Sequence, residues 1–379
     1  MSLLHQFPRA RSAQTRRRRR PYSLLTIRYF LLAAHHSLLA TFFALLLSSF
    51  LLPTSSFSFD NPVTTKRGHP DPWVYKHTDG YYYGTCTFGQ PAIALWRSKS
   101  LLDLFRTDPK IIWRAPKSGW NEQAIWAPEL HYIDGAFYIY YAATTNKAAG
   151  PNRRMGVLKC DGPDPIAGKW TDLGKLKMPD GDTWAIDGTV LQQNNKLYFI
   201  WSGQRVNTDK NQKLYIMPMS SPTKLTGKRL EISRPTYDWE RQGNKNITDV
   251  NEGPEILKHG DKTFVIYSAS FCGTRYYKLG MLTIAADADP MVLANWKKSK
   301  VPLFQEGNGL YGPGHCSFTT DASGQDWIIY HARLTSKDER EEAGFGGIPR
   351  YACLQPFTWT ATGYPNFGAP QKTNIPAPK

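Results

Sequence analysis

The sequence predicts an all-β fold, a five-bladed β-propeller, for residues 59–379. Three observations favour this fold. A strand–turn–strand pattern recurs five times, its turns lie about 55 to 66 residues apart, and no long amphipathic helix is evident. Short strands repeated at this period are typical of sheets arranged radially around an axis. A two-sheet sandwich is the runner-up.

Each of the five units places a tight polar turn between two β-prone runs. The paired residues of these turns tolerate positive φ, which two-residue hairpins require. In chain order the turns are Asp79-Gly80, Asp134-Gly135, Asn194-Asn195, Gly260-Asp261 and Ser323-Gly324. Further β-prone runs at 92–96, 155–159, 214–217 and 278–283 supply additional strands. Four strands in each of five units would fill about 300 residues, which is close to the length of the body.

Residues 1–58 are interpreted as a targeting segment and not as part of the fold. Residues 1–59 contain eight arginines and no Asp, Glu or Lys, and residues 29–59 carry no formal charge. Ser56-Phe57-Ser58 offers small residues at a cleavage site before Phe59. A cleaved secretory signal with an Arg-rich front is one interpretation. An uncleaved signal anchor is the other, because residues 29–53 are long enough to span a bilayer.

Either interpretation directs residues 59–379, the predicted propeller domain, out of the cytosol. The protein is therefore expected to be secreted, or alternatively to be signal-anchored at a membrane. Five cysteines with no C-x-x-C pair allow at most two disulfides and exclude a dense disulfide scaffold. Asn246-Ile247-Thr248 is a sequon for N-glycosylation.

The composition excludes several classes of protein. Apolar residues make up 41% of the chain, enough for a substantial core, and the 21% of charged residues does not indicate a disordered polyelectrolyte. The net charge of +16 is misleading, because the arginines of residues 1–59 supply half of it. The rest of the chain has no long basic run, so no nucleic-acid partner is expected.

Acidic residues recur where the innermost strand of each unit begins. These positions hold Asp71, Glu129, Asp187 and Glu252, and the fifth unit has His315 there. In a propeller, three or four of these carboxyl groups and the histidine would converge on one axial pocket. Turn caps or a metal cage are the alternatives. Like charges in a confined site push their pKa values apart, so that one acid stays protonated while another is ionised, as glycosidic-bond hydrolysis requires.

Six segments in this order resemble the motif set of family 43 of the glycoside hydrolases. They are HPDPWV (69–74), WAPE (126–129), IDGT (186–189), NEGPE (251–255), GHCS (314–317) and RYACLQP (350–356). The resemblance implies a five-bladed propeller and inversion of the anomeric configuration. It assigns Asp71 as general base, Asp187 as the orienting acid that raises the pKa of its neighbour, and Glu252 as general acid.

Within the family, the opening and closing segments look most similar to exo-acting α-L-arabinofuranosidases. The expected substrate is a plant cell-wall polysaccharide or oligosaccharide, from which L-arabinose would be released, and the protein is expected to be a monomer. A β-xylosidase, an endo-arabinanase of the same family and a non-catalytic sugar-binding propeller are the alternatives. Loops at 146–154 and 239–246 would wall off one end of the cleft and favour exo action.

Three further residues complete the predicted site. Trp126 is a candidate stacking wall for the sugar, with core packing as the alternative. Arg350 would bind sugar hydroxyls or orient a carboxylate, unless it forms an inter-blade salt bridge. His315, by the same resemblance, would support a hydrated structural Ca²⁺ in the channel, unless it is a hydrogen-bonded structural histidine. The chemistry itself is expected to need no cofactor.

Overall fold

The structure is a computed structural model that describes residues 57–145, 152–206, 209, 211–243, 249–338 and 348–379. The predicted targeting segment up to residue 56, the sequon at 246–248 and parts of both predicted wall loops (146–151 and 244–246) lie outside the described residues. None of the helices within these ranges has the length and apolar character needed to cross a membrane. All five cysteines have free thiols, so neither of the two disulfides that the sequence allows is formed.

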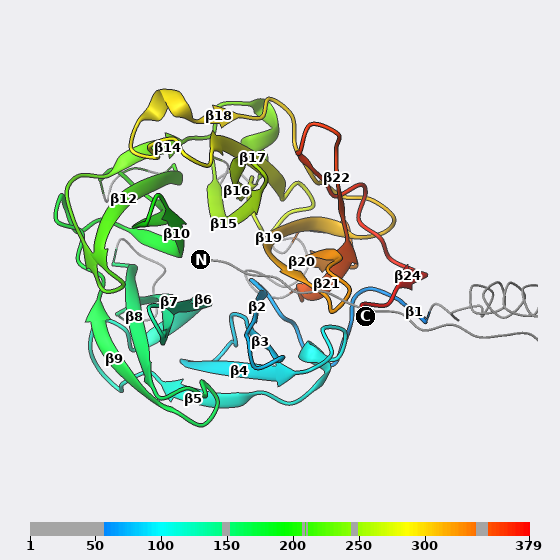
Figure 1. Ribbon diagram of the computed structural model, residues 1–379, viewed down its shortest axis with the longest axis horizontal. Coiled ribbons are helices and arrows are strands. Elements are labelled where there is room, and N and C mark those ends of the chain that lie inside the picture. Colours follow the sequence, from blue (N-terminus) through cyan, green and yellow to red (C-terminus); the bar gives the residue numbers. More distant parts are fainter. Residues whose placement is uncertain (1–56, 146–151, 207–208, 210, 244–248, 339–347) are drawn as a thin grey trace, which may run out of the picture. The chain divides into compact units, whose positions relative to one another are not determined.

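The described part of the chain forms five antiparallel sheets arranged as blades around an axis (Figure 1). The first blade contains β2 (Trp73–Lys76), β3 (Tyr82–Thr85), β4 (Ala92–Ser98) and β5 (Lys110–Arg114). The second contains β6 (Gln123–Ile133), β7 (Ala136–Thr144), β8 (Arg154–Asp161) and β9 (Lys169–Lys175). The third contains β10 (Ala185–Gln193), β11 (Lys196–Gly203), β12 (Lys213–Ser221), β13 (Lys224–Leu225) and β14 (Leu230–Ser233).

The fourth blade contains β15 (Asn251–His259), β16 (Lys262–Ala269), β17 (Lys278–Ala285) and β18 (Lys297–Lys298). The fifth contains β19 (Tyr311–Thr320), β20 (Asp326–Arg333) and β21 (Tyr351–Pro356). Three short 3-10 helices, at Leu104–Arg106, Asp238–Glu240 and Leu293–Asn295, lie between strands. The predicted five-bladed propeller is confirmed. The expected four strands per blade hold for three blades, whereas the third blade has five strands and the described part of the fifth has three.

The predicted hairpin turns join the first two strands of each blade. Asp134 and Gly135 have φ values of 50° and 79°, and Asn194 and Asn195 have values of 53° and 56°. Positive φ at both central residues is the signature of the type I′ turn, whose twist matches that of the flanking strands. The turns lie at the ends of the innermost strands opposite to those where the acidic residues occur.

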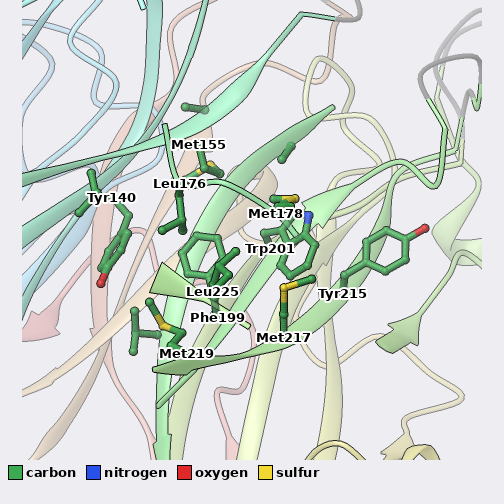
Figure 2. Packing of buried hydrophobic residues seen from close by; sticks show 14 of the residues in the cluster. Tyr140, Met155, Leu176, Met178, Phe199, Trp201, Tyr215, Met217, Met219 and Leu225 are labelled. Atoms are coloured by element: carbon green, nitrogen blue, oxygen red, sulfur yellow. The ribbon is translucent and has the colours of Figure 1, made fainter. Parts of the chain in front are cut away.

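Apolar side chains fill the spaces between neighbouring blades. Figure 2 shows the cluster between the second and third blades, where Phe199 and Trp201 of β11 pack with Tyr140 of β7 and Met155 of β8. Trp201 is completely buried. Similar clusters lie at each of the other interfaces between blades, including the one between the fifth blade and the first. Each blade therefore contributes both of its faces to the core.

The ring is closed by segments from opposite ends of the described chain. Strand β1 (Ser58–Phe59) pairs with β24 (Ile375–Pro376), with Phe59 opposite Ile375. The buried Asn61 side chain donates to the carbonyl oxygens of Leu354 and Gln371, each at 2.8 Å. A separate pair of strands, β22 (Thr358–Trp359) and β23 (Pro365–Asn366), lies between β21 and this closure in sequence.

Candidate active site

One backbone irregularity recurs at the same place in every blade. A residue at or just before the innermost strand adopts a left-handed φ of 40° to 59°. The five residues are Asp71, Ala127, Asp187, Gly253 and His315. In the second to fifth blades the strand pairing also skips there, for example between Ile186 and Thr189 and between Glu252 and Glu255. Such bulges turn side chains away from the regular alternation of a strand, so they aim these positions at the axis.

The structure brings all six predicted site residues together in one pocket. Asp71, Trp126, Asp187, Glu252, His315 and Arg350 line a cavity of about 200 Å³, along with Thr87, Ile186 and Cys272. The volume is below the roughly 300–1,000 Å³ of pockets for drug-sized ligands, so it suits one small sugar ring. The acidic residue of the second blade does not reach this pocket. Glu129 lies two residues beyond the bulge, where its carboxylate contacts the His131 ring at 3.0 Å.

Asp71 is held as a carboxylate by the groups around it. Its Oδ1 lies 3.2 Å from Arg350 Nη1 and 3.3 Å from His315 Nδ1, and Thr87 donates a hydrogen bond of 2.6 Å to Oδ2. Burial alone would raise the pKa of Asp71, but these partners outweigh it and lower the pKa to about 2. Asp71 is therefore ionised at any ordinary working pH and can accept a proton.

A buried histidine fixes the backbone of Asp71. The Asp71 N–H donates to His331 Nδ1 at 3.1 Å, and the His331 side chain is completely buried. Burial holds the pKa of His331 well below its usual value, so the ring is neutral and Nδ1 serves as an acceptor. The distance of 3.5 Å from Nδ1 to Asp71 Oδ1 is consequently not an ion pair.

Glu252 has the opposite surroundings. Burial raises its pKa to about 7, the charge of Asp71 adds to the rise, and a hydrogen bond of 2.9 Å from the Tyr277 hydroxyl to Oε1 opposes it. A carboxyl group with this pKa stays largely protonated in mildly acidic solution and can donate a proton. Glu252 and Asp71 thus differ in protonation, which is the division of labour that two-carboxylate glycosidases need.

Asp187 lies between these two acids in the sequence and accepts a 3.0 Å hydrogen bond from the Gly253 N–H. Burial raises its pKa to about 7, and the charges of Glu252 and Asp71 add to this, although His315 opposes it. The assignment of Asp187 as the acid that raises the pKa of Glu252 stays a prediction, and the charge that raises this pKa beside burial is that of Asp71. Desolvation of the Glu252 carboxyl group is the larger cause, since the pocket buries it.

Trp126 has a dual environment. Its partly exposed ring lines the pocket and also packs against the core between the second and third blades. The guanidinium of Arg153, which is almost completely buried, lies 3.3 Å from the centre of the ring. Such a cation–π contact holds the indole at one orientation.

The sequence prediction missed several groups of the site. Thr87 and Cys272 lie on connections after β3 and β16, and Tyr277 directly precedes β17. His331 lies on the second strand of the fifth blade. The repeat aligns only the starts of the innermost strands, so these residues carried no positional signal. Ile186 could have been found, because it directly precedes Asp187 in one of the motif segments.

The predicted calcium site has limited support from the donor atoms. Within the described ranges, no group of three or more His, Cys, Asp or Glu side chains is placed to coordinate a metal ion. Calcium takes six to eight oxygen ligands, so these residues do not fit a directly bound ion. His315 Nδ1 faces Asp71, which leaves Nε2 as the other ring nitrogen. A hydrated ion beside His315 stays a prediction.

Comparisons with known proteins agree with this geometry. The sequence model described as "Glycosyl hydrolases family 43" matches residues 59–365. An extracellular exo-α-(1→5)-L-arabinofuranosidase from Streptomyces avermitilis is 39% identical over 83% of this chain, which spans 64% of that relative. An enzyme with the same description from Streptomyces chartreusis is 38% identical, and the match covers 73% of this chain and 82% of the relative.

A solved structure supports the same relationship. The α-L-arabinofuranosidase from Lactobacillus brevis superposes with a TM-score of 0.75 at 38% sequence identity. The superposition covers 83% of this chain and 98% of that one. The family model covers most of the described propeller, including the segments that carry Asp71, Asp187 and Glu252. The chain therefore belongs to family 43 of the glycosyl hydrolases.

Proposed function

We propose that this protein is an inverting α-L-arabinofuranosidase that releases L-arabinose from arabinan or arabino-oligosaccharides. The observation that carries the proposal is the pair Asp71 and Glu252, which lie in one small pocket with opposite protonation states. The arabinofuranosidase names of the relatives from Streptomyces and Lactobacillus support this choice of sugar.

In the proposed reaction, a water molecule attacks the anomeric carbon through its oxygen atom. The Asp71 carboxylate accepts a proton from this water molecule at the same time. Glu252 donates its proton to the glycosidic oxygen, and the bond between that oxygen and the anomeric carbon breaks. Attack from the face opposite the leaving group turns an α-linked arabinosyl unit into β-arabinose. The ionised Glu252 and protonated Asp71 then return to their starting states by exchange with water.

Other pocket residues support these two groups. Asp187 accepts the Gly253 N–H and so orients the backbone next to Glu252. Arg350 pairs with Asp71, and we propose that it also contacts sugar hydroxyls from the same wall of the pocket. Trp126 is proposed to stack on the sugar ring with the part of its indole that lines the pocket.

The experiment is a time course of the purified protein on linear arabinan, with NMR of the first product. Free arabinose should appear from the start, in the β configuration. Early dimers and trimers would indicate endo action. Retention of configuration would exclude Asp71 as a general base. Cleavage of xylosides alone would favour the β-xylosidase, and sugar binding without any cleavage would favour the non-catalytic alternative.

Glu252→Gln tests the acid separately. The variant should lose hydrolytic activity on arabinan by a factor on the order of 10²–10⁴, because a general acid typically contributes that much to the rate. The loss should be much smaller on an aryl arabinofuranoside, since its leaving group departs without protonation. Equal losses on both substrates would contradict the assignment of Glu252 as the acid.

We further propose that the protein is secreted and acts on plant cell-wall polysaccharide outside the cell. The charge pattern of residues 1–58 supports this, as does the word "extracellular" in the names of two relatives. When the full chain is expressed in a secreting host, the protein recovered from the culture medium should start at Phe59. Activity that stays with the membrane fraction would favour the uncleaved signal anchor.

The proposed hydrated ion beside His315 is tested separately. Activity is measured after EDTA treatment, with and without added Ca²⁺.

A further inference from the structure

The proposed acid and base come from different blades. Each must exchange a proton with the reactants, so the two carboxyl groups need a fixed position relative to each other. Asp71 belongs to the start of the first blade, and Glu252 belongs to β15 of the fourth. The fifth blade lies between them in the ring (Figure 1). Two buried aromatic side chains, Tyr277 and His331, connect these positions.

Tyr277 contacts the acid. Its side chain is completely buried, and its hydroxyl donates to Glu252 Oε1 at 2.9 Å. A protonated carboxyl group accepts best through its carbonyl oxygen, so the proton of Glu252 is placed on Oε2. Tyr277 thereby determines which oxygen of the acid can donate.

His331 contacts the base. Asp71 has a φ of 59°, a strained conformation for a residue with a side chain, and its N–H donates to His331 Nδ1 at 3.1 Å. The neutral, completely buried ring of His331 therefore holds the backbone that aims the Asp71 carboxylate.

The two rings stack on each other. Their centres are 5.5 Å apart and their planes differ by only 3°. The backbone of the fifth blade makes room for this stack at Gly314, where a Cβ atom would lie 2.3 Å from Tyr277 Cε1. Any side chain at residue 314 would therefore displace the tyrosine ring.

We propose that Tyr277 and His331 are positioning residues that join the acid and the base into one unit across three blades. Tyr277 selects the donating oxygen of Glu252, His331 fixes the backbone of Asp71, and the stack between their rings sets the relative position of the two. This inference rests on the proposed glycosidase function.

The test uses two variants that keep an aromatic ring in place. Tyr277→Phe removes only the hydroxyl, and His331→Phe removes the Nδ1 acceptor. Each is assayed for kcat/KM on arabinobiose, which needs a protonated leaving group, and on para-nitrophenyl α-L-arabinofuranoside, which does not. Since Tyr277 acts through the acid, Tyr277→Phe should lose about 10- to 100-fold on arabinobiose and less than about 3-fold on the aryl substrate. Since His331 acts through the base, His331→Phe should lose to a similar degree on both.

Tyr330→Phe is the matched control. Tyr330 is also a completely buried tyrosine, and its hydroxyl donates to Gln355 Oε1 at 3.0 Å, but neither residue lines the pocket. Tyr330→Phe should lower the melting temperature about as much as Tyr277→Phe does, with no change in the ratio between the two substrates. If the ratio of kcat/KM on arabinobiose to kcat/KM on the aryl substrate changes equally in Tyr277→Phe and Tyr330→Phe, the proposal is overturned.

Other outcomes also decide the matter. Equal losses on both substrates in Tyr277→Phe, with its melting temperature close to that of the control variant, would show that Tyr277 does not act through the acid. A wild-type protein that cleaves only xylosides would end the proposed arabinofuranosidase function, and the same variants compared on xylobiose and its aryl counterpart would still decide the positioning role. A wild-type protein with no hydrolytic activity would overturn both.

Discussion

Asp71 and Glu252 illustrate how the contacts of a carboxyl group determine its chemistry. Both are nearly buried, and burial pushes the pKa of each upward. Asp71 gains Arg350, His315 and Thr87 as partners of its charged form, whereas Glu252 gains the single hydroxyl of Tyr277. Charge-assisted partners stabilise a carboxylate more than one neutral hydroxyl does, so only Asp71 stays ionised.

The pH dependence of activity follows from this difference. In the proposed reaction, the free enzyme needs Glu252 protonated, with a pKa of about 7, and Asp71 ionised, with a pKa of about 2. We therefore expect kcat/KM to be constant in mildly acidic solution and to fall as the pH rises through about 7. Asp187 titrates in the same range, so the apparent value belongs to the coupled groups. A kcat/KM profile checks this, and a rise in activity between pH 7 and 9 would contradict it.

Stability should depend on pH with opposite signs for the two acids. The pKa of Glu252 is raised on folding, so its contribution to stability is present below pH of about 4.5 and is lost as the pH rises through about 7. A glutamine at this position does not ionise, so the Glu252→Gln variant does not lose this stability as the pH rises. Its melting temperature, relative to wild type, should therefore increase by a few degrees between pH 5 and pH 8.

Asp71→Asn provides the contrast. The pKa of Asp71 is lowered, so its contribution is present above pH of about 4 and is lost only as the pH falls through about 2. This variant should be less stable than wild type at pH 5, and the deficit should shrink toward pH 8, because loss of the Asp71 charge also lowers the pKa values of Glu252 and Asp187. Thermal unfolding at pH 5 and at pH 8 measures the difference in melting temperature between each variant and wild type. The same difference at both pH values for Glu252→Gln would show that ionisation of the Glu252 carboxyl group does not destabilise the folded protein.

The residues of the site divide by how much sequence signal they carry. Asp71, Asp187 and His315 could be predicted because the repeat places them at one position of their blades, and Glu252 because it directly precedes that position. Trp126 and Arg350 could be predicted from motif segments. Tyr277, His331 and Thr87 could not, because tertiary packing brings them against Glu252 and Asp71 and they have no counterpart at the repeated position.

At the scale of single elements, the bulge in each innermost strand is the feature that builds the site. Gly253 shows how little freedom it leaves. Its φ is 52°, its N–H donates to Asp187, and a Cβ atom there would lie 3.1 Å from the His315 ring. The bulge beside Glu252 therefore needs a residue without a side chain.

Gly253→Ala and Gly260→Ala form a matched pair that tests this. Gly260 has a similar φ of 56°, but a Cβ atom there would meet nothing within 4 Å. Both variants should lose about 1–2 kcal/mol of stability from the left-handed backbone. Only Gly253→Ala should also lose activity, by about 10-fold or more, because its methyl group displaces His315 from Asp71. Equal activity of the two variants, measured as kcat/KM, would argue against the contact.

The sequence predicted the hairpins of the propeller better than its outer strands. Asp134-Gly135 and Asn194-Asn195 carry their own turn chemistry, so local residues sufficed. The extra strand of the third blade and the three strands of the fifth depend on which outer segments find a partner, for example Leu230–Ser233 against β12. The bulges were not predicted either, since Asp, Ala and His at left-handed φ have no common local pattern.

For the whole molecule, closure of the ring combines the apolar cluster between the first and fifth blades with the hydrogen bonds of Asn61. Asn61 is 3% exposed, donates to two carbonyl oxygens, and accepts the Leu354 N–H at 3.0 Å. These bonds tie the segment after β1 to β21 and to the segment that leads into β24. Phe59 and Ile375 add apolar contacts in the same cluster as Trp327.

Asn61→Ala should weaken this closure. It leaves the buried N–H and C=O groups of Leu354 without their partner, at a cost of about 1–3 kcal/mol each if water does not replace it, and it also removes the bond to the Gln371 carbonyl. We expect a clear drop in melting temperature with kcat/KM nearly unchanged at low temperature, because the hydrogen-bond partners of the Asn61 side chain, Leu354 and Gln371, do not line the pocket. Asn295→Ala, which removes one bond from a partly exposed asparagine to the Asp289 carbonyl, should change neither quantity. A melting temperature for Asn61→Ala equal to that of wild type would mean that the apolar cluster alone closes the ring.

The pairing of β1 with β24 also means that the order of the blades is cyclic and not linear. Residues 58–59 and 375–376 already run side by side. A short linker between these strands, with a new opening cut at the exposed turn around Gly260, would give a circular permutant in which every blade keeps its neighbours. Such a permutant should keep the pocket, because the proposed acid, the proposed base and the residues that contact them would still meet at the same axis.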